Sequence, residues 1–340
     1  MTFNPLPEIR NDSSKVQLDR ISHVFFDHPD LNKFHTFAID FGLTPVETSN
    51  EDLRLYRGYG KDPYCYVARR SKTGKPAFGG GAFLAQTEAE FDKAAAIESA
   101  VISDLSGLPG GGRMITLKSP AGFPFHVVHG IEDRQGEGPV PSAQVESLGP
   151  LNGSVNKNRK FQRFHPGPAL VHKLGHYGFI VSEWEKEVDW YTRNFNFVPS
   201  DVQYAPQNEN MDVVTFMHLD LGERYSDHHS LFVSRATPGE GDRMHHASFE
   251  VEDFDTQLLG HEWLAGKNYT SVWGVGRHIL GSQIFDYWRD PTGFTIEHYA
   301  DGDLVNVHTG TKRSMAGALH VWGPEMTDEM MKDGTSPTAA

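Results

Sequence analysis

The sequence predicts an α+β protein whose curved sheets close around a cavity. Three observations support this class. The composition is globular, with 38% hydrophobic and 22% charged residues among 340. The chain contains an internal repeat, and each repeated unit begins with a strand-like run, continues with a short helix-like stretch and ends in several further strands. Together they indicate four modules, two to a domain, that pack helices and curved sheets around a cavity.

The first and third modules begin with related segments. Residues 21–43 ("ISHVFFDHPDLNKFHTFAIDFGL") align with residues 174–197 ("LGHYGFIVSEWEKEVDWYTRNFNF"), with one residue of slippage. Each has a histidine at the head of a strand-like run, then an amphipathic stretch, then Phe with Gly or Asn where a helix would stop. We expect these modules near residues 20–80 and 173–234.

The second and fourth modules are related in the same way. "GAFLAQTEAEFD" (81–92) resembles "HASFEVEDFD" (246–255), because each is a strand that runs into acidic residues typical of a helix start. Their last strands also align, since "SPAGFPFHVVHG" (119–130) and "DPTGFTIEHYADG" (290–302) share Pro, Gly and Phe positions. These modules are expected near residues 80–131 and 244–300.

The domain organisation follows from these modules and from the segments between them. Residues 132–172 are rich in Gly, Pro, Asn and Ser and read as a linker or an arm over a neighbour. The last segment continues no module and is interpreted as a lid, a subunit contact or a partly disordered tail, so we expect a homo-oligomer. The expected parts are an N-terminal arm (1–19), an N-terminal domain without metal (20–131), the linker (132–172), a C-terminal catalytic domain (173–303) and a tail (304–340).

Charge and composition exclude several classes of function. The net charge of −14 and the lack of a Lys/Arg cluster argue against a nucleic-acid partner. No apolar run approaches the length of about 18 residues that spans a bilayer, and the first residues lack the pattern of an export signal, so we expect a cytoplasmic protein without a membrane partner. Cys65 is the only cysteine. A bound metal would therefore need histidine and carboxylate ligands.

Three side chains of the later half are candidate metal ligands. His176 and His246 open the third and fourth modules in the same pattern, His-x-x-Phe-x-Val. We prefer His246 to its neighbour because adjacent residues of a strand face opposite sides. Glu297 ends an apolar run, where a carboxylate is costly unless it is paired or binds a metal. Two imidazoles and a carboxylate form the facial triad of non-haem Fe(II) oxygenases.

The earlier half serves as an internal comparison for this site. It keeps His23 at the first position, but Gly81 and His126 replace the other two ligands, so that half cannot assemble the same site. Taken singly, His176 would more often be a hydrogen-bonded core histidine and Glu297 a surface acid. Their matching places in a duplicated frame favour the metal site.

At these residues the chain resembles a known family. The run "GRHILGSQIFDYWRDPTGFTIE" (276–297) is similar to the signature of the type I extradiol ring-cleavage dioxygenases of the vicinal oxygen chelate superfamily. "LGHYGF", "DHHSLF" and "MHHASF" resemble the other motifs of that family, in order. The similarity covers about residues 20–303. It departs at Asp286, where the signature has an apolar residue.

The resemblance implies a role for each site residue. His176, His246 and Glu297 would hold Fe(II), with Mn(II) as an alternative metal for these ligands. His229 would be the acid–base residue, since an imidazole titrates near neutral pH; it could instead be a surface histidine, because adjacent histidines in a strand point to opposite faces. Tyr287 would hydrogen-bond the bound substrate oxygen, or else be a core aromatic. His278 would contact substrate, or else be a loop histidine.

The resemblance also implies an activity: extradiol cleavage of a small catecholic substrate with both atoms of O2, giving a ring-opened, semialdehyde-type product. Two alternatives remain. A glyoxalase-like isomerase of the same superfamily usually has two carboxylate ligands with one or two histidines, and has nothing in the roles of His229 and Tyr287. A non-catalytic aromatic-binding protein needs no metal ligands.

Overall fold

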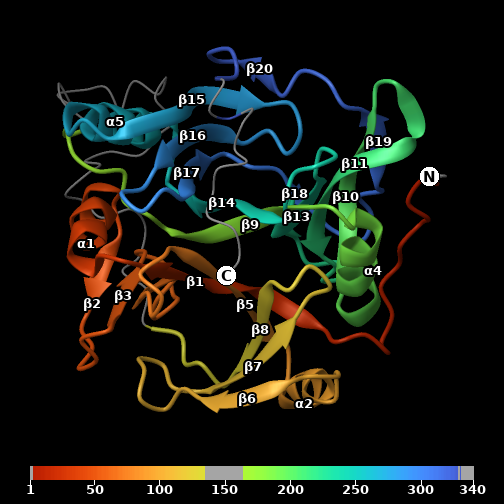
Figure 1. Ribbon diagram of the computed structural model, residues 1–340, viewed down its shortest axis with the longest axis horizontal. Coiled ribbons are helices and arrows are strands. Elements are labelled where there is room, and N and C mark those ends of the chain that lie inside the picture. Colours follow the sequence, from red (N-terminus) through yellow and green to blue (C-terminus); the bar gives the residue numbers. More distant parts are fainter. Residues whose placement is uncertain (1–2, 135–163, 328–329, 331–340) are drawn as a thin grey trace, which may run out of the picture.

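A computed structural model of the chain describes residues 3–134, 164–327 and 330, and contains two large sheets (Figure 1). The first sheet contains, in spatial order, β2 (Thr44–Val46), β3 (Leu53–Arg57), β4 (Tyr66–Arg70), β1 (Leu18–His28), β5 (Ala77–Ala85), β8 (Pro124–His129), β7 (Arg113–Lys118) and β6 (Val101–Asp104). The second contains β19 (Lys312–Met315), β10 (Phe197–Ala205), β11 (Asn208–Leu219), β13 (Leu231–Arg235), β9 (Lys173–Val181), β14 (Arg243–Glu250), β17 (Thr295–Ala300), β16 (Ile284–Arg289), β15 (Thr270–His278) and β20 (His320–Trp322).

The helices complete four modules of the order strand, helix and three strands. The described helices are α1 (Leu31–Asp40), α2 (Glu88–Ala95), α4 (Trp184–Asn194) and α5 (Phe254–Gly266). The modules are β1-α1-β2-β3-β4, β5-α2-β6-β7-β8, β9-α4-β10-β11-β13 and β14-α5-β15-β16-β17. In each module the first strand pairs in parallel with the last, and within each half the first strands of the two modules pair antiparallel. The predicted α+β class is confirmed.

Side-chain caps mark the starts of α1 and α5. Asp30 accepts hydrogen bonds from the backbone of Asn32 and Lys33 at the start of α1, and Asp253 accepts one from Thr256 at the start of α5. The cap fixes where each helix starts. The face of α1 that carries Phe34 is fully buried against the first sheet.

The sheets meet along β1 and β9, which lie side by side at the centre of the molecule (Figure 1). A turn in each half contacts the other half. The backbone of Ala121 donates to Glu187 Oε2 of α4 at 2.9 Å, and Thr292 Oγ1 lies 2.7 Å from His28 Nδ1 at the end of β1. These reciprocal contacts give the two halves a fixed relative orientation.

The repeat positions seen in the sequence occupy equivalent places on the strands. His23, Gly81 and His126 lie on β1, β5 and β8 at the same distance from the strand end as His176, His246 and Glu297 on β9, β14 and β17. In the first sheet this region is filled by a cluster of buried side chains: Phe25, Leu55, Tyr64, Val67, Ala82 and Leu84. The second sheet instead leaves a cavity there.

The segments outside the modules pack against both sheets. The backbone N–H of Leu6 donates to Asp212 Oδ2 of β11 at 2.7 Å, so the N-terminal arm reaches the later half (Figure 1). The tail adds β19 and β20 at opposite edges of the second sheet, and β18 (Leu304–Val305) pairs with β12 (Ser226–Asp227). The linker residues 135–163 and the tail residues 328–329 and 331–340 lie outside the described chain, and the expected domain boundaries stay a prediction.

None of the helices in the described part of the chain has the length and apolar character needed to cross a bilayer.

Candidate active site

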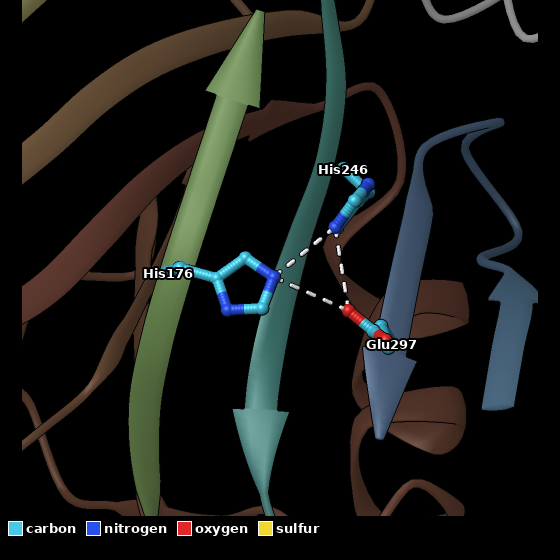
Figure 2. Close-up of side chains that lie close together, drawn as sticks. All are labelled: His176, His246 and Glu297. Carbon is cyan, nitrogen blue, oxygen red and sulfur yellow. Dashed lines mark hydrogen bonds and ion pairs between the residues drawn. The ribbon is translucent and has the colours of Figure 1, made fainter. Parts of the chain in front are cut away.

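His176, His246 and Glu297 converge from three neighbouring strands, β9, β14 and β17 (Figure 2). Strand register explains the meeting, because Ser248 of β14 is paired with both His176 and Glu297, and His246 lies two residues away on the same face. The Nε2 atoms of the two histidines are 3.3 Å apart. Glu297 Oε2 lies 3.4 Å from His176 Nε2 and 3.3 Å from His246 Nε2.

The electrostatics of this group fit a bound cation. Glu297 is 0% exposed, and neither of its carboxylate oxygens accepts a hydrogen bond from the described residues. Burial lowers the pKa of His176 to about 4, so its imidazole is neutral at neutral pH. Burial alone would raise the pKa of Glu297, but the two imidazoles hold that pKa well below its usual range. A buried carboxylate facing two imidazole nitrogens is stabilised by a metal ion that takes one ligand atom from each.

His229 lies beside this group and is buried. It sits between β12 and β13, and its ring centroid is 4.0 Å from that of His176. Burial and the neighbouring imidazoles lower its pKa well below the usual value. His228 is buried as well, so the adjacent histidines do not point to a buried and a solvated face. They lie outside a regular strand, where side chains need not alternate.

Tyr287 and His278 form one hydrogen-bonded unit on the other side of the site. His278 Nδ1 lies 3.0 Å from the carbonyl oxygen of Leu319, which only accepts, so this nitrogen carries the proton. Burial lowers the pKa of His278, which keeps the ring neutral. Its Nε2 must then accept from the Tyr287 hydroxyl at 2.9 Å. Tyr287 is the cross-strand partner of Glu297, which places it next to the candidate ligands.

His245 is a cavity residue that alternation along the strand fails to predict. The pairing of β14 with β9 shifts register between Met244 and His246, which leaves His245 as an extra residue in a bulge. Its Nδ1 lies 2.7 Å from His246 Nδ1, and both side chains line the same cavity. The doublet "HH" signals two histidines, but nothing in the sequence marks the bulge.

Asp286 is the residue that departs from the family signature. It is fully buried on β16, where His261 Nδ1 lies 2.9 Å and Trp288 Nε1 2.7 Å from its carboxylate oxygens. Burial raises its pKa, and the bond from His261 opposes this shift. Asp286 does not line the cavity with Tyr287. The departure therefore affects the packing behind the strand.

The cavity has a volume of about 190 Å³ and is lined by His176, His246, His229, His278 and Tyr287. Most of the remaining wall is apolar: Val214, Phe216, Phe232, Trp273, Leu280 and Leu319. Neutral polar groups come from Gln203, Ser234 and Gln283. Among the described lining residues none is Lys or Arg. The sequence did not indicate the apolar wall residues individually, because they come from strands and a tail segment far apart in the chain.

Comparison with known proteins finds a family match in the later half of the chain. Residues 173–298 match the family model described as the Glyoxalase/Bleomycin resistance protein/Dioxygenase superfamily. The chain is 28% identical over 200 residues to metapyrocatechase 2 of Cupriavidus necator, a match that spans 58% of this chain and 58% of that protein. The resemblance drawn from the motifs is confirmed at the level of the superfamily.

Solved structures share the whole fold. Homoprotocatechuate 2,3-dioxygenase from Arthrobacter globiformis has a TM-score of 0.74 with 17% identity, covering 99% of this chain and 96% of its own. A Mn(II)-bound glyoxalase from Novosphingobium aromaticivorans has a TM-score of 0.73 with 18% identity, covering 95% of each chain. At these identities the likeness shows the fold, the vicinal oxygen chelate fold expected from the motifs.

Proposed function

We propose that the protein is an Fe(II)-dependent extradiol dioxygenase. The premise is that residues 173–298 form a domain of this superfamily, which includes dioxygenases. It would cleave a catecholic ring next to the two hydroxyls with both atoms of O2 and give a ring-opened, semialdehyde-type product. The observation that carries the proposal is the buried group of two histidines and one carboxylate, whose histidines line a cavity together with His229 and Tyr287.

His176, His246 and Glu297 would hold the metal, in keeping with their converging nitrogen and oxygen atoms. Bound iron would supply a Lewis acid that favours the ionised diol and a redox centre for O2; Mn(II) also suits these ligands. Because only three side chains would hold the metal, the diol oxygens and O2 could also bind to it.

The other residues would handle protons and orientation. His229 would take a proton from a substrate hydroxyl and return one later, since its ring lies against the ligand His176. The Tyr287 hydroxyl donates to His278, and because a hydroxyl oxygen can also accept a hydrogen bond, it would orient a substrate hydroxyl in the cavity. The apolar walls would exclude water from the ring and its reactive products.

The cavity also suggests which catechols bind. Its described walls carry no Lys or Arg to pair with a carboxylate, and aromatic and aliphatic side chains cover most of its surface. Leaving a substrate carboxylate unpaired there would be costly. We propose that uncharged catechols, with hydrogen or small apolar substituents, are the preferred substrates.

An isomerase is the second candidate, because a metal-bound glyoxalase shares the fold. Such an enzyme would polarise a carbonyl next to a hydroxyl and would not consume O2. The described metal-binding group contains one carboxylate, Glu297, and the cavity holds His229 and Tyr287 in addition. Both features favour the dioxygenase.

The test is anaerobic reconstitution with Fe(II), followed by a panel of catechols with uncharged and carboxylated substituents. We expect O2 uptake and a yellow ring-opened product, with higher kcat/KM for the uncharged members. Turnover of a hydroxycarbonyl substrate without O2 uptake, and no catechol consumption by metal-loaded protein, would establish the isomerase instead.

A further inference from the structure

We infer that Asp201 and His228 fix the tautomer of His229, so that the ring nitrogen left for the cavity is a proton acceptor. The use of that acceptor in catalysis rests on the proposed function; the tautomer itself does not. Asp201 is thus assigned as a positioning residue, acting through His228 on the acid–base histidine.

The three side chains form a continuous hydrogen-bonded chain. His229 Nδ1 lies 3.1 Å from His228 Nδ1, and His228 Nε2 lies 2.6 Å from Asp201 Oδ2. All three residues are buried. The other carboxylate oxygen of Asp201, Oδ1, has no hydrogen-bond partner among the described residues, so the contact to His228 is the one that satisfies this carboxylate.

Backbone structure holds the chain of groups in place. Asp201 lies on β10, where it pairs with Phe216 of β11 on one side and Lys312 of β19 on the other. The backbone N–H of His228 donates to the carbonyl of Asp303 at 3.0 Å, and the Ser200 hydroxyl donates to the carbonyl of His228 at 2.5 Å. These two hydrogen bonds fix the backbone of His228, and so the position from which its side chain reaches Asp201.

The proton positions follow from which atoms can donate. An ionised carboxylate only accepts, so His228 Nε2 carries the proton and donates it to Asp201. We take His228 as the neutral ring, in which the other nitrogen, Nδ1, is then an acceptor. His229 Nδ1 must therefore carry the proton and donate to His228, which leaves His229 Nε2 without a proton. His229 lines the cavity beside the candidate metal ligands.

For the reaction this means that His229 is ready to act as a base, with Nε2 unprotonated, before substrate binds. When a catechol hydroxyl transfers its proton, the O–H bond breaks, the electron pair stays on oxygen and a new N–H bond forms at His229 Nε2. The resulting imidazolium still donates from Nδ1 to His228, and the Asp201 carboxylate compensates its charge through that ring. A carboxylate that orients an acid–base histidine in this way is a recurring device in enzymes.

Asp201 and His228 also border a second hollow of about 290 Å³, outside the catalytic cavity. Leu280 lines both spaces and lies between them. The exposed Asp303 lines this second hollow too, where Ser282 Oγ donates to its Oδ2 at 3.0 Å. Asp303 thus offers a matched control: it is a carboxylate in the same hollow whose side chain is bonded to Ser282 instead of to the His228 ring.

The direct test is the tautomer of His229 in metal-free protein labelled with [15N]histidine. Two-bond 1H–15N correlation spectra at about pH 8 distinguish a protonated Nδ1 from a protonated Nε2, and a His229→Gln variant identifies the resonance. We expect His229 to be protonated at Nδ1. A proton at Nε2, or a mixture of the two tautomers, would overturn the inference, because it would mean that His228 donates to His229.

The second test compares Asp201→Asn with Asp303→Asn. An amide can donate as well as accept, so Asp201→Asn makes both tautomers accessible; we expect a mixed His229 signal and a kcat lowered by roughly 10–100-fold, with KM and metal content unchanged. Asp303→Asn should match wild type in all of these. If both variants keep the wild-type tautomer and kcat, Asp201 has no positioning role; if Asp201→Asn does not fold, the wild-type spectrum alone decides.

The two proposals fail separately. A metal-loaded protein that cleaves no catechol, but shows the Nδ1–H tautomer of His229, would remove the proposed function and keep the inference. An active dioxygenase with His229 protonated at Nε2 would keep the proposed function and remove the inference about the tautomer.

Discussion

At the scale of single residues, the candidate ligands could be predicted because the chain is duplicated. His176 and His246 stand at matching places in two modules, and the structure brings both within 3.4 Å of Glu297. Their counterparts His23, Gly81 and His126 offer no carboxylate. Comparing the two halves therefore distinguishes the candidate metal site from the equivalent positions of the earlier half, which lack a full set of ligands. The ligand role of the three residues stays a prediction until bound metal is measured.

Other residues of the site depend on local backbone geometry that the sequence does not show. His245 joins the cavity because of a bulge, and His228 turns inward because it lies between strands. The rule that side chains alternate along a strand fails at both places. The same rule holds for His176 and Glu297, which lie within regular strands.

The acid–base role of His229 predicts a specific kinetic loss. In His229→Ala we expect kcat to fall by about 10²–10⁴-fold, the usual contribution of a positioned acid–base group, while bound Fe(II) is retained. Steady-state kinetics and metal analysis on the same sample check this. The exposed His308 gives a control, since His308→Ala should leave both unchanged. Unaltered turnover in His229→Ala would transfer the role to another residue.

At the scale of elements, close contact of the two halves depends on glycine in a central strand. Gly81 of β5 faces the ring of Tyr177 on β9, and a Cβ atom at Gly81 would lie 2.1 Å from that ring. The ring is buried and enclosed by Phe78, Phe83 and Phe179, so it has little room to move. The glycine that replaces a ligand in the earlier half therefore has a packing role of its own.

We expect Gly81→Ala to lower the free energy of unfolding by about 1–3 kcal/mol through overpacking. Denaturant titration measures this difference. Gly107→Ala is the matched control, because a Cβ atom there would meet nothing within 4 Å, and its effect should stay within about 0.5 kcal/mol. Equal stability of the two variants would show that the interface between the halves adapts.

The strands of the tail mark the limit of prediction at this scale. β19 and β20 are short, and most of their residues are exposed, so they carry little hydrophobic pattern. Their pairing with β10 and β15 joins segments distant in sequence. The four modules could be predicted because each carries its own strand and helix pattern; the tail strands depend on edges that exist only in the folded sheet.

At the scale of the whole molecule, buried neutral histidines should make folding sensitive to acid. Burial lowers the pKa of His23 and His28 to about 3 and that of His126 and His218 to about 4. The unfolded chain takes up these protons below about pH 6.5 while the folded chain does not, so stability falls as pH decreases. Burial raises the pKa of Asp290 to about 7 and also raises the pKa of Asp62, Glu187 and Asp286, and these carboxyl groups oppose the trend in part.

We expect the Tm of the metal-free protein to be nearly constant above about pH 7 and to fall between about pH 6.5 and pH 4. Each histidine contributes up to about 1.4 kcal/mol per pH unit in this range. Thermal unfolding followed by circular dichroism across this range measures the profile. A Tm that stays level or rises as pH falls from 6.5 to 4.5 would show that these imidazoles are protonated in the folded state.

The central claim is that one half of a duplicated chain binds a single metal ion and the other half binds none. Its most direct measurement is the Fe(II) content per chain after anaerobic reconstitution and desalting, in wild type, Glu297→Ala and His126→Gln, the last changing the equivalent position of the earlier half. We expect one Fe(II) per chain in wild type and in His126→Gln, and none in Glu297→Ala. Iron retained in Glu297→Ala, or lost in His126→Gln, would contradict the account.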